Sequence, residues 1–277
     1  MDVGKSIRYI FEDKQWFSKV LIGSLILLVS IPLTFVLVGF LGLAIVTGYS
    51  LDVLRNVRAG SARPLPEWRD RWGEWLIEGL KLMLILFVWS LPLIVLNVFT
   101  GIGDSMLNLN SGLLNLSGGM MIAAASCLML LWGIVVALVT PAIYLRLAET
   151  RELGSGFQFN SIYVWTRDNI GDVVIAVILS TLLTLAYVLV GSVIGILLCG
   201  IGLALTLPAA TMLGTLVTVH LYAQIGQGRQ ARAQTSVTQS TPPAAPVEPQ
   251  PKDTTMVVGP DGTIIVTPSS ESSRSKG

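Results

Sequence analysis

Residues 82–103 read LMLILFVWSLPLIVLNVFTGIG and contain no Lys, Arg, Asp or Glu. A helix of roughly 20 apolar residues spans the hydrocarbon core of a bilayer, and this stretch meets that length. Three further runs, 20–51, 105–145 and 173–228, are equally free of charge. Only 13% of the chain is charged and 52% is hydrophobic, whereas about a quarter of a soluble protein is charged. The sequence therefore predicts an all-α membrane protein.

The positively charged residues are concentrated in four segments of the chain. All 18 Lys and Arg residues fall in 1–19, 52–81, 146–172 or the tail after Gly228. Under the positive-inside rule, these four segments are cytoplasmic. Residues 101–119, GIGDSMLNLNSGLLNLSGG, carry Asp104 as their only charge, and their Gly, Asn and Ser content predicts an external loop.

Two cytoplasmic flanks require an even number of crossings between them. Residues 20–51 are long for one span and short for two, and Pro32 and Gly39 predict a break between two short helices. The alternative is one long helix with an external N-terminus. A polytopic bundle of about six spans follows, and both termini are expected to be cytoplasmic. The expected spans are 20–34, 36–54, 82–100, 120–145, 173–195 and 202–223.

Amphipathic segments flank these spans and predict helices lying in the membrane interface. The first and third also share Ser-Ile followed by Asp, at Ser6 and Asp13 and again at Ser161 and Asp168, each ahead of an apolar hairpin. This shared order predicts an internal duplication. The three apolar stripes are Val3, Ile7, Ile10, Phe11 and Phe17; Trp68, Trp72, Trp75 and Gly79; and Phe159, Ile162, Tyr163 and Ile170.

The composition changes after Gly228 to Gln, Ser, Thr, Ala and Pro, as in QTSVTQSTPPAAPVEPQPK. Such a segment buries too little apolar surface to fold alone. The predicted organisation is a transmembrane domain over 1–228 and a disordered cytoplasmic tail over 229–277. Residues 256–258 and 263–266 flank Gly-Pro-Asp-Gly, so a hairpin or a strand docked on a partner is the alternative.

The loop after the first expected hairpin carries a recognisable pattern. Gly48-Tyr49 is followed by Arg55 and Arg58, by Leu65-Pro66-Glu67-Trp68 and by Glu78-Gly79-Leu80-Lys81. This pattern resembles the prokaryotic membrane-protein family known as domain of unknown function 4013 (DUF4013), over about residues 1–225. The resemblance implies a multi-helix membrane protein and supplies no catalytic or ligand residues.

The sequence contains few motifs that are typical of catalysis or ligand binding. Gly101-Ile102-Gly103-Asp104 matches the Gly-x-Gly-Asp signature of intramembrane aspartyl proteases, but that chemistry needs a second carboxylate nearby. The candidate, Asp52, is expected on the opposite membrane face. His220 is the only histidine, and Cys127 and Cys199 each lie inside an apolar run, which predicts buried free thiols. No metal, nucleotide or nucleic-acid motif is present, so we expect neither a cofactor nor an enzymatic activity.

The leading hypothesis is a non-enzymatic scaffold or partner subunit of a prokaryotic cytoplasmic membrane. It would bind the lipid bilayer and a protein partner, the latter through the 52–81 loop or the tail. The alternative is a channel or transporter for a neutral solute or lipid, because the span interiors hold no charge for ion coupling. Its polar path would use Asn97, Thr140, Ser180, Thr181, Thr184, Thr206 and Thr211. The candidate interaction loop comprises Pro66, Glu67, Trp68, Trp72 and Trp75.

Overall fold

The computed structural model describes residues 2–227 except 62, 70, 110 and 199, together with 254–258 and 264–268. The chain divides into two compact units, Met1–Gly228 and Arg229–Gly277. The first unit is entirely helical where it is described. Its helices are α1 Val3–Glu12, α2 Trp16–Leu33, α3 Gly39–Arg58, α4 Trp72–Leu107, α5 Gly112–Thr150, α6 Phe159–Asp168, α7 Ile170–Leu197 and α8 Ile201–Gln224.

Six of these helices, α2, α3, α4, α5, α7 and α8, are long and apolar enough to cross a membrane. The predicted all-α polytopic bundle is confirmed, and the chain is a multi-pass membrane protein. Residues 20–51 form two helices, with the 3-10 turn Thr34–Val36 and a left-handed Leu37 (φ 63°) between them. Gly200, at φ 78°, lies in the turn between α7 and α8. Glycine adopts this backbone conformation without a steric penalty.

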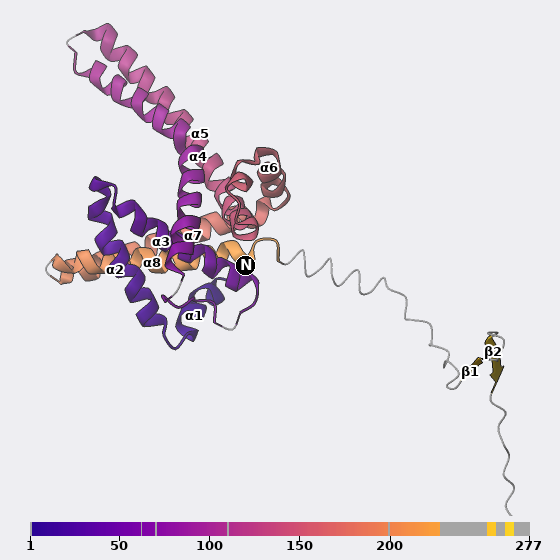
Figure 1. Cartoon of the computed structure of the whole chain (residues 1–277). Coiled ribbons are helices and arrows are strands. Elements are labelled where there is room, and N and C mark those ends of the chain that lie inside the picture. The colour runs from indigo at the N-terminus through magenta and orange to yellow at the C-terminus, as the bar shows by residue number, and fades with distance from the viewer. Residues whose placement is uncertain are drawn as a thin grey trace, which may run out of the picture. The chain divides into compact units, whose positions relative to one another are not determined.

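Helices α4 and α5 are far longer than predicted and run side by side away from the other helices (Figure 1). They contain 36 and 39 residues, or about 54 and 58 Å at 1.5 Å per residue. The external loop predicted over 101–119 is wrong, because both helices continue through it and leave only residues 108–111 between them. Gly103 of α4 and Gly118 of α5 are buried against each other, so the small residues taken for loop formers permit close helix packing instead.

Helix α3 lies at the centre of the unit and packs against α2, α4 and α8. Two glycines allow α3 and α4 to approach closely where they cross. A Cβ on Gly48 would overlap the Trp75 backbone, and a Cβ on Gly79 would overlap the Ala44 backbone. The two backbones therefore touch along this crossing, which is possible only because both positions lack a side chain.

Within the described part of the first unit, the segments 1–19, 52–81 and 146–172 lie at one end of the helices. Ser6 of α1 contacts His220 near the end of α8 at 2.9 Å, and Arg58 at the end of α3 pairs with Glu149 at the end of α5 at 2.9 Å. Arg146 of α5 donates to Gln158, just before α6, at 2.8 Å. The order of a short helix followed by a two-helix hairpin occurs twice, as α1–α2–α3 and as α6–α7–α8. The internal duplication itself stays a prediction.

The second unit contains two strands, β1 Thr254–Val258 and β2 Ile264–Pro268. They pair antiparallel, with Thr254 opposite Pro268 and Val258 opposite Ile264. This is the hairpin that the sequence left as an alternative. The prediction of disorder for the rest of 229–277 falls outside the described residues.

Candidate functional site

The loop between α3 and α4 is fixed to the helix bundle by its Leu-Pro-Glu-Trp stretch. Leu65 and Trp68 are buried, and the Trp68 ring stacks on Tyr49 with centroids 4.1 Å apart and planes 5° apart. Trp68 Nε1–H donates to the Lys19 carbonyl at 2.9 Å. Lys19 Nζ in turn donates to the Leu65 carbonyl and to Asp13 Oδ2, each at 2.7 Å. Every polar group of this junction that enters the protein interior therefore has a partner.

This packing corrects two expectations about the tryptophans. The Trp-striped helix does not lie separately in the membrane interface, because Trp72 is the first residue of α4. Trp75 is 0% and Trp68 9% exposed, so neither can meet a partner without unfolding the loop. Of the candidate interaction loop, Glu67 and Trp72 are exposed and Pro66 is half-buried. The aromatic rings fill the space beside Gly48 and Tyr49, which hydropathy along the chain does not reveal.

A buried ionic network joins α3, α4 and α5 next to this loop. Asp52 and Glu78 are both nearly inaccessible. Arg55 Nη1 lies 2.5 Å from Glu78 Oε2 and 3.4 Å from Asp52 Oδ1, and Arg55 Nε–H donates to the Ala148 carbonyl at 2.7 Å. Arg71 completes the network by pairing with Asp52. Buried charges persist only when they are paired in this way, so the network holds the three helices in register.

Arg71 also links the network to the surface. It pairs with Glu74 at 2.7 Å as well as with Asp52. The hydrogen bonds to Glu74 and the nearby Asp52 carboxylate raise the pKa of Arg71, although its partial burial opposes the charge. Arg71 is therefore a permanent cation at the start of α4.

His220 lies in a polar cluster that the sequence did not predict. Its Nδ1 is 2.9 Å from Ser6 Oγ and 3.1 Å from Gln224 Nε2, and its ring stacks on Tyr9 at 4.4 Å. The Tyr9 hydroxyl donates to the Leu216 carbonyl at 2.8 Å, and burial raises the pKa of Tyr9, so it stays protonated. Ser6 is fully buried. A serine beside a histidine suggests a nucleophile, but a substrate cannot reach a hydroxyl enclosed in this way.

The two carboxylates considered for aspartyl chemistry lie far apart. Asp52 contacts Trp75 Nε1 at 3.2 Å, near the start of α4, whereas Asp104 lies near the end of the same helix. The 29 helical positions from 75 to 104 correspond to about 43 Å, so the two groups cannot share a proton. Within the described residues, no cluster of three or more His, Cys, Asp or Glu side chains could hold a metal ion. Cys127 is a free thiol and is exposed on α5, so the expectation that it is buried is wrong.

The polar residues of the hypothetical transport path do not converge. Thr140, Thr181 and Thr211 each donate to a carbonyl one turn earlier in their own helix. Thr206 lines an apolar groove of about 370 Å³ between α2 and α8, and its buried hydroxyl has no hydrogen-bond partner among the described residues. Asn97 is exposed on α4, away from all of them. The transport alternative stays a prediction.

The outer part of the α4–α5 hairpin, residues 90–138, is here called the arm. Its buried residues are Gly103, Gly118 and Ala125, all small and all between the two helices. One flank of the arm is bulky and apolar. It carries a groove of about 540 Å³ lined by Leu91, Pro92, Val95, Leu96, Leu128, Leu131, Trp132 and Val135. Lipid tails can fill such a groove, because they are as apolar as its walls.

The opposite flank of the arm carries several small side chains, with the exposed Ile94 and Leu130 at the same helical spacing. On α4, Asn97, Gly101 and Ser105 recur every four residues, which places them on one side of a helix. On α5, a matching set lies on the same flank, and we call the two sets together the small-residue face. A Cβ on Gly101, Gly119 or Gly133 would have nothing within 4 Å. The α5 members are Gly119, Ala123, Ser126 and Gly133.

Two polar groups on the small-residue face have no hydrogen-bond partner among the described residues, the Asn97 amide and the Ser126 hydroxyl. Both residues are exposed. Asn97 lies 16 residues beyond Lys81, or about 24 Å along α4, and so remains inside a hydrocarbon core of about 30 Å. An amide facing lipid tails there costs free energy, because hydrocarbon offers no hydrogen bond. Exposure of the Asn97 amide on the small-residue face to lipid is therefore unfavourable.

Sequence reasoning named Asn97 only as part of a transport path and gave 101–119 to a loop. The sequence does contain one indication of this face, the recurrence of small residues every four positions on both sides of the expected loop. This pattern can be recognised only once it is known that α4 extends to Leu107 and that α5 begins at Gly112.

Comparison with known proteins supplies a family and no activity. Residues 31–200 match the model of the family described as protein of unknown function (DUF4013). No curated protein and no solved structure matches the chain.

Proposed function

Because the chain belongs to the DUF4013 family of proteins of unknown function, we propose a role from its own geometry. It is a non-enzymatic subunit of a membrane complex, and the small-residue face of its arm packs against a transmembrane helix of another protein. We further propose that it resides in a prokaryotic cytoplasmic membrane with both termini cytoplasmic.

The observation that carries this proposal is the amide of Asn97, one turn before Gly101 on an exposed surface of α4, which has no hydrogen-bond partner among the described residues. Small residues let helix backbones approach closely, and an Asn side chain hydrogen-bonds across such an interface. Within a membrane, no hydrophobic force drives helices together, so close packing and interhelical hydrogen bonds supply the association energy. The small-residue face offers both.

The shape of the arm supports the same role. The arm extends from the rest of the first unit (Figure 1), and the only residues buried in its described part are Gly103, Gly118 and Ala125. A partner helix can therefore lie along the small-residue face without displacing another helix of the chain. The orientation is supported by the Lys and Arg residues of 1–19, 52–81 and 146–172, because Arg58 and Arg146 make contacts at the end of the bundle opposite the hairpin turns.

The test uses bulky substitutions that the isolated chain accommodates. Gly101→Leu and Gly133→Leu add side chains where a Cβ meets nothing, so the double variant keeps its fold and its monodispersity in detergent. We expect the partner that co-purifies with the wild-type chain in mild detergent to be lost, because two Leu side chains keep the partner backbone from approaching.

The matched control is Val95→Phe, which adds comparable bulk in the apolar groove on the opposite flank. It should retain the partner. Equal loss of the partner in both variants, or repeated purification of the wild-type chain without any stoichiometric partner, contradicts the proposal. If only a second, differently tagged copy of this chain co-purifies, the partner is the chain itself and the proposed complex is a homodimer.

A further inference from the structure

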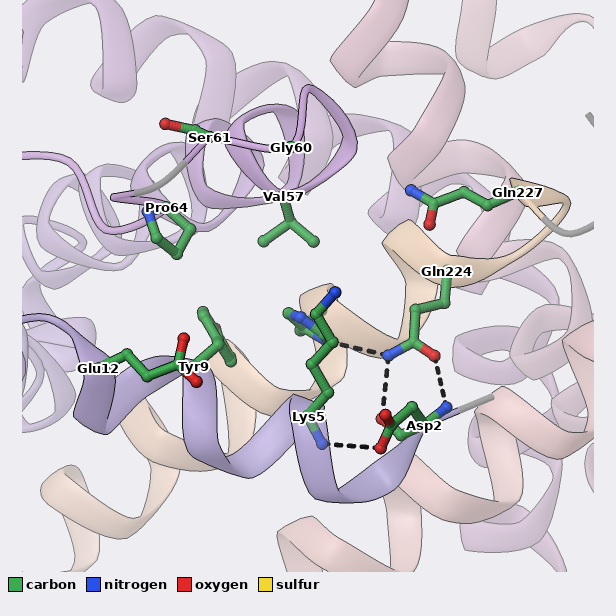
Figure 2. Close-up of a pocket in the computed structure, with 11 residues that line it drawn as sticks. Asp2, Lys5, Tyr9, Glu12, Val57, Gly60, Ser61, Pro64, Gln224 and Gln227 are labelled. Atoms are coloured by element: carbon green, nitrogen blue, oxygen red, sulfur yellow. Dashed lines mark hydrogen bonds between the residues drawn. The ribbon is translucent and has the colours of Figure 1, made fainter. Parts of the chain in front are cut away.

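A polar cavity of about 400 Å³ opens at the end of the bundle where α1, α3 and α8 meet. Figure 2 shows its walls, with α1 on one side and Val57, Gly60, Ser61 and Pro64 on the other. The volume lies within the range of small-molecule sites. This cavity is separate from the arm, and nothing in the proposed function requires it.

The wall formed by α8 presents a buried histidine. The Asp2 backbone N–H donates to Gln224 Oε1 at 2.8 Å, which fixes the orientation of that amide. Gln224 Nε2 lies 3.1 Å from His220 Nδ1, and Ser6 Oγ lies 2.9 Å from the same nitrogen. Nδ1 therefore has polar neighbours within the protein, and Nε2 is the ring nitrogen that remains for a ligand. Nε2 has no hydrogen-bond partner among the described residues, although His220 is only 3% exposed and lines the cavity.

The wall formed by α1 presents two charges of opposite sign. Lys5 and Glu12 line the cavity and form no ion pair with another described residue. They stand seven positions apart on one side of α1, or about 10 Å along the helix. Figure 2 shows the Lys5 side chain reaching across the cavity and Glu12 entering from the other end, with Tyr9 between them. The cavity thus has the Lys5 ammonium at one end, with Asp2 beside it, and the Glu12 carboxylate at the other end.

We propose that this cavity binds a small zwitterion of the amino-acid class. The ligand carboxylate accepts from Lys5 Nζ and from His220, in the tautomer that carries its proton on Nε2. The ligand ammonium donates to Glu12. A single anion would leave Glu12 and Asp2 unneutralised beside it, and a single cation would face Lys5 and a histidine that donates. A zwitterion satisfies both ends at once.

The test measures thermal unfolding of the full chain in detergent with each protein amino acid added separately. Acetate, methylammonium and inorganic phosphate serve as probes of one charge sign. We expect at least one amino acid to raise the unfolding temperature more than any of these three probes does, because only a zwitterion engages both ends. Titration of that amino acid by calorimetry then gives its Kd.

Lys5→Gln and Glu12→Gln should each weaken binding of that amino acid about tenfold or more, since each removes one charged contact. Both side chains are exposed at the cavity mouth, so both variants fold. Lys14→Gln is the matched control, because Lys14 lies on the same segment but does not line the cavity. The proposal is overturned if no amino acid exceeds the single-charge probes, if Lys14→Gln weakens binding equally, or if phosphate binds best and Glu12→Gln has no effect.

Discussion

At the scale of single residues, the contacts of Trp68 explain the structural role of the Leu-Pro-Glu-Trp stretch in this chain. The Trp68 indole stacks on Tyr49 and donates to the Lys19 carbonyl, so one side chain ties the loop to both α2 and α3. Pro66 contributes its carbonyl, which accepts from the Tyr49 hydroxyl at 3.2 Å. These contacts stabilise the fold, and the burial of Leu65 and Trp68 makes both side chains inaccessible to a partner.

Trp68→Ala should destabilise the chain by about 3–5 kcal/mol, because a large buried ring and its hydrogen bond are lost together. Released from its anchor, the loop should also be cut faster by trypsin after Arg69, which is exposed. Detergent thermal unfolding and a digestion time course measure the two effects. Trp72→Ala is the control, since Trp72 is 37% exposed. If Trp68→Ala left stability unchanged but abolished binding of a partner, the loop would be a docking site for that partner after all.

Asp13 and Lys19 make one junction sensitive to pH. Burial opposes the charge on Asp13, but the hydrogen bonds from Lys19 and from the Gln15 backbone N–H outweigh it and lower the pKa of Asp13. A carboxyl whose folded pKa is depressed contributes stability above its unfolded pKa, and this contribution is lost as the pH falls through the folded value.

The unfolding temperature of the wild-type chain should therefore drop as the pH is lowered below about 4, the ordinary pKa of an aspartate. Asp13→Asn should lower stability at neutral pH and flatten this acid dependence. Asp104→Asn, at an exposed position on α4, should leave the profile as it is. A profile for Asp13→Asn as steep as that of the wild-type chain would assign the acid sensitivity to another carboxyl.

At the scale of elements, the crossing of α3 and α4 depends on Gly48 and Gly79. Each glycine lies against the backbone of the other helix, so the ionic network beyond the crossing forms only if both remain glycine. Asp52 and Arg55 of α3 lie one and two turns past Gly48, and Glu78 of α4 is adjacent to Gly79.

Gly48→Val should force the two helices apart and separate Arg55 from Glu78. Overpacking of this kind costs about 1–3 kcal/mol or more, and parting a buried ion pair adds to it. The expected result is aggregation or a broadened peak in size-exclusion chromatography. Gly73→Ala, near the start of α4 where a Cβ meets nothing, should elute as the wild-type chain does. Normal elution of Gly48→Val would mean that the crossing is looser than the structure shows.

At the scale of the whole molecule, six spans and four positively charged segments make a topology that can be tested in cells. Reporter fusions at residues 5, 60, 160 and 230 should give a cytoplasmic signal, and fusions at 36, 110 and 198 should give an external one. The alternation follows from the three hairpins, whose turns lie at 34–38, 108–111 and 198–200. An external signal from the fusion at residue 5 would show that α2 and α3 do not cross the membrane as a hairpin.

The sequence by itself determined the fold class, the family and the presence of six membrane-spanning helices. A membrane span must be about 20 residues long and free of charge, and Lys and Arg concentrate in cytoplasmic segments. These are properties of each stretch of sequence by itself, so they can be recognised without the tertiary structure. The break near Pro32 and Gly39 and the turn near Gly200 were predictable for the same reason.

Only the tertiary structure decided the extent of the arm, the burial of Trp68 and Trp75, and the meeting of Ser6 with His220 across the length of the chain. The glycines and asparagines of 101–119 favour a loop in isolation, yet they lie in helices because Gly103 and Gly118 let two backbones touch. Which side of a helix faces a neighbour depends on the position of that neighbour. The small-residue face and the polar cavity therefore exist only in the folded chain.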